Sequence, residues 1–348
     1  MAKVRLGFLG CGFMGQLAHL YNYAVLEDCE IMGLFDIRPK LAAKVAAAYG
    51  VPKVYANAAE MLNDPQVDAI VASQQFNNHV NIVCDVLNAG KHILTEKPLC
   101  VYAENGKKLV ECAEKNKKIH MVANHKRSDP AVEYAMDVIK KWKVSGELGK
   151  MRYIRLTMPP GDWTCGASHP IGRPIRSDEP VPAFLPEPTP TGISPETAER
   201  HITFVNYYIH QVNLMRHLFG EDYKLTFADK TGVILAVESD SGVAGVIEMA
   251  PYSTTDSWQE SAMVCFEKGY VFIKMYAPLI NQKAGEVEIF TDNGGGGLYT
   301  YPVLPNISAM MNQAMNFIKA IKGEVQPPCS SADALKDLEF AAAYIRAC

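Results

Sequence analysis

A glycine-rich hexapeptide near the start of the chain has the residue types and spacing that can hold a pyrophosphate. It reads Gly10-Cys11-Gly12-Phe13-Met14-Gly15. In this pattern the first glycine permits a tight turn, the second lets the backbone approach a phosphate, and the third lets the following helix pack on the preceding strand. The N-terminus of that helix adds N–H donors and a partial positive charge. The hexapeptide therefore predicts a dinucleotide as ligand.

The sequence around the hexapeptide supports this interpretation. The apolar run 4–9 precedes it, a helix-like stretch follows it, and a second apolar run, 30–35, ends at Asp36. A carboxylate at the end of that second strand accepts hydrogen bonds from the adenosine ribose and repels a 2′-phosphate, which favours NAD over NADP. Arg38 leaves NADP as the less favoured alternative, because its guanidinium can pair with a phosphate or stack on the adenine.

The elements that must position these residues alternate between short apolar runs and helical patterns over residues 1–124. This alternation is typical of βα units that build a doubly wound parallel sheet of the Rossmann type. The expected strands are residues 4–9, 30–35, 53–56, 69–73, 92–95 and 119–123. Such sheets bind their ligands at the carboxyl ends of the strands. The polar residues at those ends are therefore site candidates: Ser73, Gln74, Gln75, Glu96, Lys97 and Asn124.

The pattern changes after residue 124, so we expect a second domain over residues 125–348 that binds substrate and forms the oligomer. A helical stretch over 198–219 is followed by β-rich segments over 224–304, which predict a large, mostly antiparallel open sheet. Two amphipathic helices, 309–322 and 332–347, should pack back on the body. The expected fold class is thus α/β, a Rossmann domain followed by an α+β domain.

A proline-rich segment, 159–197, carries ten of the 21 prolines and excludes a regular helix or central strand. We interpret it as an ordered lid, binding loop or subunit arm rather than a disordered insertion, because Trp163 and Phe184 can anchor it.

The composition excludes several classes of protein. The formal net charge is −4 and the basic residues are scattered, which argues against nucleic acid as a partner. The chain runs directly into its first strand and no apolar stretch reaches membrane-spanning length, so we expect a cytoplasmic protein that acts on a small molecule. The nine cysteines form no CxxC pair, which predicts no metal site and no disulfide framework. Cys11 and Cys165 are the candidates for a reactive thiol.

One face of the predicted second sheet carries apolar residues that a monomer would leave uncovered. Val243, Val246 and Phe272 are examples. This face predicts a homodimer or homotetramer.

Lys97 is the first candidate for catalysis. It lies in Thr95-Glu96-Lys97-Pro98, directly after the strand expected at 92–95. At the edge of the sheet a lysine can donate a hydrogen bond to a substrate hydroxyl. With its pKa lowered by burial and by the nicotinamide cation, it can also help to deprotonate that hydroxyl. A solvated surface lysine is the alternative.

Three features together resemble one known family. They are the glycine-rich loop, the run Ala89-Gly90-Lys91-His92-Ile93-Leu94 that leads into Glu96-Lys97-Pro98, and the mixed domain that follows. Over nearly its whole length the chain is similar to the Gfo/Idh/MocA oxidoreductases. The resemblance implies that Lys97 and a histidine on the first helix of the second domain flank the reacting carbon.

The family helix commonly reads Asp-x-Gly-x-His-x-x-Asp, and the matching stretch here runs from Asn206 to Asn213. His210 is kept, while both acids are replaced by amides. The resemblance therefore implies that His210 is the catalytic base beside Lys97. Asn206 either binds substrate as a neutral amide or leaves the chemistry to Lys97 and His210 alone.

A further departure follows the strand at 69–73, where the family often has Thr-Pro-Asn-x-x-His and this chain has Ser73-Gln74-Gln75-Phe76-Asn77-Asn78-His79. We expect His79 to position this loop. The expected cofactor contacts are the hexapeptide 10–15, Asp36, Arg38, Ser73, Gln74, Gln75, His79, Glu96 and Lys97. The expected substrate contacts are Asn124, Lys126, Arg127, Trp163, Asn206 and Gln211. For Arg127 a structural ion pair is an equal alternative.

These assignments predict an enzyme that oxidises a secondary hydroxyl of a sugar, cyclitol or glycoside by hydride transfer to NAD. The resemblance extends to members that oxidise the C3 hydroxyl of glycosides. Two alternatives remain. One is an NAD-dependent glycosidase that oxidises C3 transiently and eliminates the substituent, and the other is a non-catalytic NAD-binding regulator.

Overall fold

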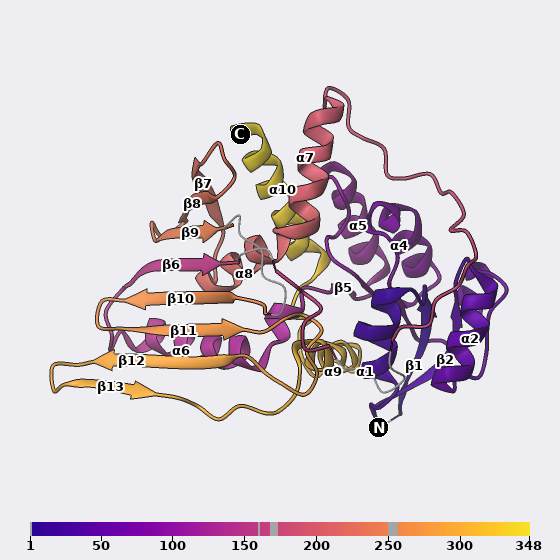
Figure 1. Ribbon diagram of the computed structural model, residues 1–348, viewed down its shortest axis with the longest axis horizontal. Helices are drawn as coiled ribbons and strands as arrows, with labels where there is room; N and C mark the ends of the chain where they lie inside the picture. The colour runs from indigo at the N-terminus through magenta and orange to yellow at the C-terminus, as the bar shows by residue number, and fades with distance from the viewer. Residues whose placement is uncertain (1, 159–160, 168–172, 250–256) are drawn as a thin grey trace. The chain divides into compact units, whose positions relative to one another are not determined.

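The structure is a computed structural model that describes residues 2–158, 161–167, 173–249 and 257–348 (Figure 1). Its internal contacts divide the chain into two units. The first unit is made of Met1–Asn124, Ser168–Asn206 and Gln313–Glu339. The second unit is made of His125–Ala167, Tyr207–Asn312 and Phe340–Cys348. The first boundary between the units lies after Asn124, and the segments 168–206 and 313–339 group with the first unit. The assignment of a cofactor domain and a substrate domain stays a prediction.

The first unit is built on a parallel sheet with the strand order β2-β1-β3-β4-β5. Its strands are β1 (Val4–Leu9), β2 (Cys29–Phe35), β3 (Ala69–Ala72), β4 (His92–Thr95) and β5 (His120–Val122). The strand expected at residues 53–56 is wrong, since only the bridge between Leu34 and Val54 forms there. Pro52 has no N–H to extend a ladder, and Asn57 already caps the next helix.

Helices pack around this sheet. They are η1 (Gly15–Leu20), α1 (Tyr21–Tyr23), α2 (Pro39–Tyr49), α3 (Ala58–Leu62), η2 (Phe76–Asn78), α4 (His79–Asn88) and α5 (Ala103–Asn116). Parts of α7 (Pro195–Tyr207), α9 (Ala309–Ile321) and α10 (Ser331–Ala347) also belong to this unit. Ala314, Phe317 and Ile318 of α9 enter the same apolar core as the sheet residues Leu6 and Phe8. That burial explains why the segment 313–339 groups with the first unit.

The second unit contains an eight-stranded sheet with the order β13-β12-β11-β10-β6-β9-β8-β7. Its strands are β6 (Met151–Thr157), β7 (Tyr223–Ala228), β8 (Ile234–Ser239), β9 (Ala244–Glu248), β10 (Glu260–Phe266), β11 (Gly269–Met275), β12 (Glu286–Asp292) and β13 (Gly297–Thr300). The pair β6–β9 is parallel, and the other neighbouring strands are antiparallel. The fold class predicted from the sequence is confirmed.

One face of the eight-stranded sheet is covered and the other is partly open. Helix α6 (Pro130–Ser145) packs on β11 and β12, and α8 (Ile209–Phe219) packs on β6 (Figure 1). Strand β10 accordingly alternates buried and half-exposed residues along its whole length. On the partly open face, Val246 and Phe272 are half-exposed, and Val243, just before β9, is half-exposed as well. The oligomer interface expected here stays a prediction.

The helical stretch expected at 198–219 is two helices, because the helix breaks at Tyr208 between α7 and α8. The proline-rich segment lies in part outside the described residues. Its described parts, 161–167 and 173–194, hold no helix or strand, as the prolines predict. Among the residues that the structure describes, no helix is both long enough and apolar enough to cross a membrane.

Candidate dinucleotide and substrate site

The glycine loop after β1 adopts the close packing that its glycines permit. Gly10 has φ +89°, and a Cβ there would lie 3.1 Å from the Ser73 carbonyl oxygen. A Cβ on Gly15 would lie 2.5 Å from the Ser73 hydroxyl oxygen. That hydroxyl donates a hydrogen bond of 2.9 Å to the Gly10 carbonyl. A side chain at either glycine would push the loop away from the sheet, so this loop fits the dinucleotide that the hexapeptide predicts.

Asp36 follows β2 and is almost fully buried beside the loop. Its carboxylate accepts the Cys11 N–H at 2.9 Å and the Arg38 Nε–H at 3.0 Å. Burial by itself would raise the pKa of Asp36, but the Arg38 hydrogen bond and two backbone N–H donors outweigh it and lower that pKa. Asp36 is therefore an ionised carboxylate at the expected position of the adenosine ribose.

Cys11 is not a reactive thiol in this structure. Its side chain is fully buried, and burial followed by the charge of Asp36 raises its pKa far above the ordinary value. Phe13 and Met14, the other side chains of the loop, are exposed and half-exposed.

The loop after β3 carries the predicted glutamines and His79. Gln75 is exposed, and Gln74 is half-exposed and accepts a hydrogen bond of 3.0 Å from the Asn78 amide. His79 is buried at the start of α4, and its Nδ1 lies 3.1 Å from the Leu99 carbonyl oxygen. Burial lowers the pKa of His79. This contact supports the predicted positioning role, since it ties the loop to the segment after Lys97.

Lys97 lies at the carboxyl end of β4, as predicted. Its ammonium donates a hydrogen bond of 2.6 Å to the main-chain oxygen of Asn206. Glu96, directly before it, is buried and lies 2.7 Å from His19 Nε2. Burial by itself would raise the pKa of Glu96, but the His19 hydrogen bond and charge lower it. The side chain of Asn206 is exposed, so here its carbonyl rather than its amide meets Lys97.

The predicted substrate residues that follow β5 are largely engaged with other protein groups. Asn124 is buried, and its amide donates to Cys329 Sγ at 3.3 Å. In the second unit, the Lys126 ammonium pairs with Glu260, and Arg127 Nε donates to Asn213 Oδ1 at 2.7 Å. Both cations are buried. The partner of Arg127 in this contact is a neutral amide, and its role, substrate contact or structural ion pair, stays a prediction.

Glu260 at the start of β10 is a site residue that the sequence analysis missed. Besides Lys126, it accepts hydrogen bonds from Gln211 Nε2 at 2.6 Å and from Trp258 Nε1 at 2.9 Å. The carboxylate thus joins strand β10, helix α8 and the segment after β5 within the second unit. Gln211 is buried, and its Oε1 has no hydrogen-bond partner among the described residues.

His210 is the second residue of helix α8 and is half-exposed. Its ring meets the edge of the His125 ring, with centroids 4.9 Å apart and planes at 76°. His210 belongs to the second unit, whereas Lys97 and Asn206 belong to the first. The pairing of Lys97 with His210 stays a prediction.

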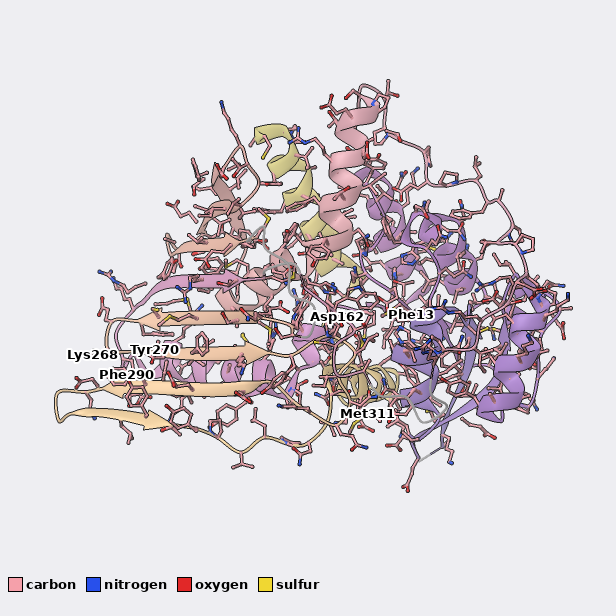
Figure 2. All side chains as sticks on the ribbon, in the orientation of Figure 1. Phe13, Asp162, Lys268, Tyr270, Phe290 and Met311 are labelled. Carbon is pink, nitrogen blue, oxygen red and sulfur yellow. The ribbon has the colours of Figure 1, made fainter. Side chains whose placement is uncertain are left out.

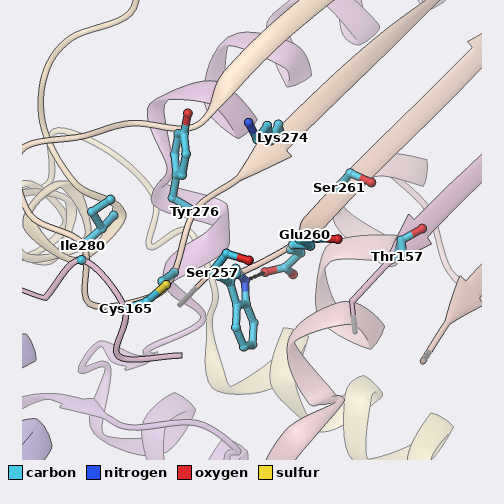
Figure 3. Close-up of a pocket in the computed structure, with 12 residues that line it drawn as sticks. Thr157, Cys165, Ser257, Glu260, Ser261, Lys274, Tyr276 and Ile280 are labelled. Atoms are coloured by element: carbon cyan, nitrogen blue, oxygen red, sulfur yellow. Dashed lines mark hydrogen bonds between the residues drawn. The ribbon is translucent and has the colours of Figure 1, made fainter. Parts of the chain in front are cut away.

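The second unit also contains a cavity of about 640 Å³ (Figure 3). Trp258, Tyr276 and Ile280 give it apolar walls, and Cys165, in the turn directly after Trp163, also lines it. Figure 3 shows Tyr276, Cys165 and Ile280 toward one end of the cavity and Thr157 and Ser261 toward the other. Within the described residues, no group of acidic, histidine or cysteine side chains is arranged to hold a metal ion.

Residues 4–124 match the model of an oxidoreductase family with an NAD-binding Rossmann fold, GFO_IDH_MocA. The chain is 23% identical over 344 residues to the myo-inositol 2-dehydrogenase of Thermotoga maritima, covering 95% of this chain and 92% of the relative. It is 26% identical over 359 residues to the inositol 2-dehydrogenase of Rhizobium meliloti, covering 99% and 96% of the two chains.

A solved structure of UDP-N-acetylglucosamine 3-dehydrogenase from Acidithiobacillus ferrooxidans superimposes with a TM-score of 0.70 at 17% identity, covering 100% of this chain and 98% of that one. This likeness concerns the fold alone. Together, the parallel sheet, its glycine loop and the family match define an oxidoreductase with an NAD-binding Rossmann fold. Residues 4–124 are therefore assigned to the NAD-binding domain of the Gfo/Idh/MocA family.

The Asp36 carboxylate should decide which dinucleotide binds. We expect Asp36→Asn to weaken NADH binding about tenfold and to strengthen NADPH binding, because the amide no longer repels a 2′-phosphate and Arg38 becomes available to pair with it. Titration of each nucleotide by its own fluorescence measures both dissociation constants. Asp28→Asn is the matched control, since that exposed carboxylate pairs with Lys322 near the other end of β2. An unchanged preference would contradict this role for Asp36.

The Lys126–Glu260 pair should stabilise the second unit. Glu260→Gln leaves a buried ammonium without a counter-charge and should lower the free energy of unfolding by about 3–5 kcal/mol in urea denaturation. The double replacement Lys126→Met with Glu260→Gln should recover most of that loss, because it removes the unpaired ammonium and keeps an oxygen acceptor beside Gln211 and Trp258. Glu267→Gln is the control, because this exposed acid pairs with the exposed Arg152. A double variant as unstable as Glu260→Gln would refute the pairing argument.

Proposed function

We propose that this protein oxidises a secondary hydroxyl of a sugar, cyclitol or glycoside with NAD. One observation carries the proposal: Lys97 lies at the carboxyl end of β4, on the same sheet edge as the glycine loop and Asp36. This is the edge at which a dinucleotide binds. When bound, the nicotinamide supplies the hydride acceptor.

In this proposal Lys97 orients the substrate and His210 takes the proton. The Lys97 ammonium already donates to a neutral oxygen, the Asn206 carbonyl. A substrate hydroxyl is the same kind of acceptor, so it can take that place or share the donor. An imidazole is suited to accept the hydroxyl proton near neutral pH. In reduction the same two groups act in reverse.

The charges of the candidate site favour a neutral, hydroxyl-rich substrate. Lys126 and Arg127, which could otherwise bind a carboxylate or phosphate, are both buried against protein partners. The remaining candidates Asn124, Asn206 and Gln211 are neutral amides, which suit hydroxyl groups. The two inositol dehydrogenases named above support a cyclitol or sugar in particular.

A glycoside substrate, oxidised at C3, is the finer form of the proposal. The cavity of about 640 Å³ is larger than a single sugar requires and falls in the range that buries a drug-sized ligand. Its aromatic walls, Trp258 and Tyr276, suit the aglycone of a glycoside. Asp36 supports NAD rather than NADP as the cofactor.

Hydride transfer should depend on both predicted catalytic residues. Offered NAD and a panel of free sugars, cyclitols, O-glycosides and C-glycosides, the protein should raise the NADH absorbance with at least one. Lys97→Ala and His210→Ala should each lower kcat/KM by at least about a hundredfold, and His210→Ala should do so without changing NADH affinity. Lys115→Ala, an exposed lysine on α5, is the control.

Full activity in either variant would refute the assigned roles. Release of an aglycone without accumulation of NADH would replace the proposal by the glycosidase alternative. NADH binding with no turnover of any substrate would favour a regulator.

We also propose that the partly open face of the eight-stranded sheet packs on a second copy of the chain. A row of aromatic rings extends across its end, with centroids 5.6 Å apart for Tyr270–Phe290 and 5.0 Å apart for Phe290–Tyr299 (Figure 2). The row continues to Tyr301, whose ring centroid lies 6.4 Å from that of Tyr299 and which is 64% exposed. Apolar side chains that gather on a surface in this way are typical of interfaces.

Light scattering should therefore give the mass of a dimer or a larger assembly. Tyr299→Lys combined with Phe272→Lys should shift it toward the monomer, because a charge on each residue would have to be desolvated in the interface. Val144→Lys, at an exposed position on α6, should leave the mass unchanged. A monomeric wild-type protein would contradict the proposal.

A further inference from the structure

The described part of the proline-rich segment does not project into solvent but is docked along one edge of the first unit. We refer to residues 173–189 as the strap. Although it contains no helix or strand, the strap makes hydrogen bonds to four separate loops or helix starts. Each of these follows a different strand, namely β1, β2, β3 or β4. The strap therefore follows the carboxyl edge of the parallel sheet, where the dinucleotide is expected.

The first anchor ties the strap to the glycine loop. Gln16 and Ile175 form a reciprocal pair, in which Gln16 Nε2 donates to the Ile175 carbonyl at 3.0 Å and the Ile175 N–H donates to Gln16 Oε1 at 2.9 Å. The same Gln16 Nε2 also donates to the Cys11 carbonyl at 2.9 Å. One amide thus joins the strap to the backbone of the predicted pyrophosphate loop. The Ile175 side chain packs against the core of the first unit.

The second anchor lies beside the expected adenosine pocket. The Glu179 carboxylate accepts the N–H groups of Lys40 at 3.1 Å and Leu41 at 2.9 Å, in the first turn of α2. That helix begins directly after Arg38, the partner of Asp36. A carboxylate is stabilised there by the partial positive charge of the helix N-terminus.

The third anchor lies at the other end of the strap, near Lys97. Glu187 is buried and accepts the Val101 N–H at 2.7 Å, the Tyr102 N–H at 2.9 Å and the Asn105 amide at 2.8 Å. Its own N–H donates to the Asn77 carbonyl at 2.8 Å. These bonds fix the strap between the loop after β3 and the start of α5.

We infer that the strap is an additional wall of the dinucleotide site and holds NAD(H) on the protein from one turnover to the next; the inference rests on the dinucleotide binding of the proposed function. Its anchors at Gln16, Glu179 and Glu187 span the edge from the adenosine side to the Lys97 side. Five prolines within the strap restrict its backbone and reduce the entropy lost on docking.

The release rate of NADH tests the strap directly. The protein–NADH complex is mixed with excess NAD and the NADH fluorescence is followed. We expect wild-type release below about 1 s⁻¹, slower than typical enzyme turnover. Glu179→Ala and Glu187→Gln should each release NADH at least tenfold faster. Glu199→Ala, an exposed glutamate on α7, is the matched control.

Hydrogen exchange of residues 173–189 supplies the second readout, and thermal unfolding checks that the variants are folded. Glu179 is half-exposed, so Glu179→Ala should keep the fold even if the buried Glu187 does not tolerate change. Wild-type release faster than about 10 s⁻¹, a typical turnover rate, would overturn the inference. The inference would also be overturned by a folded variant whose backbone amides in residues 173–189 exchange freely while its NADH release rate is unchanged. Slow NADH release without oxidation of any sugar would refute the proposed function and leave the inference standing. Fast NADH release with normal oxidation of a substrate would overturn the inference and leave the proposed function standing.

Discussion

The close contact between the glycine loop and Ser73 is the constraint on which the rest of the structure depends. The Ser73 hydroxyl bonds to the Gly10 carbonyl, and a Cβ on Gly10 or Gly15 would collide with Ser73 or with the loop itself. Because β1 and β3 are neighbours in the sheet, this contact sets the height of the pyrophosphate loop above the strand ends. Asp36 and Lys97 follow the strands on either side of this pair and so lie on the same edge.

Buried carboxylates then connect segments that are far apart in the chain. Glu96 bonds to His19, Glu187 bonds to the start of α5, and Glu260 bonds to Lys126. A buried charge without partners is strongly unfavourable, so each acid fixes the geometry of the groups around it. In the first unit, Glu96 and Glu187 fix the segments on either side of Lys97. In the second unit, Glu260 fixes the surroundings of Gln211 and Trp258.

The features predicted from the sequence are those whose signals are local. The glycine loop, Asp36, the strand before Lys97 and the helix carrying His210 each depend on a few neighbouring residues. The strand predicted at 53–56 is wrong, because a short apolar run does not show whether its backbone can form a continuous row of hydrogen bonds with a neighbouring strand. Glu187 and Glu260 were missed because their partners lie 86 and 134 residues away. In a sequence, such acids look the same as solvated ones.

Transfer of deuterium tests the central claim most directly. The protein is incubated with NAD and with sugars, cyclitols and glycosides that carry deuterium on their ring carbons, and the nicotinamide is examined by NMR. Hydride transfer from a secondary alcohol predicts deuterium at C4 of the nicotinamide, on one face only, and no label taken from deuterated water. A nicotinamide that binds at the glycine loop but gains no deuterium from any of these substrates would contradict the account.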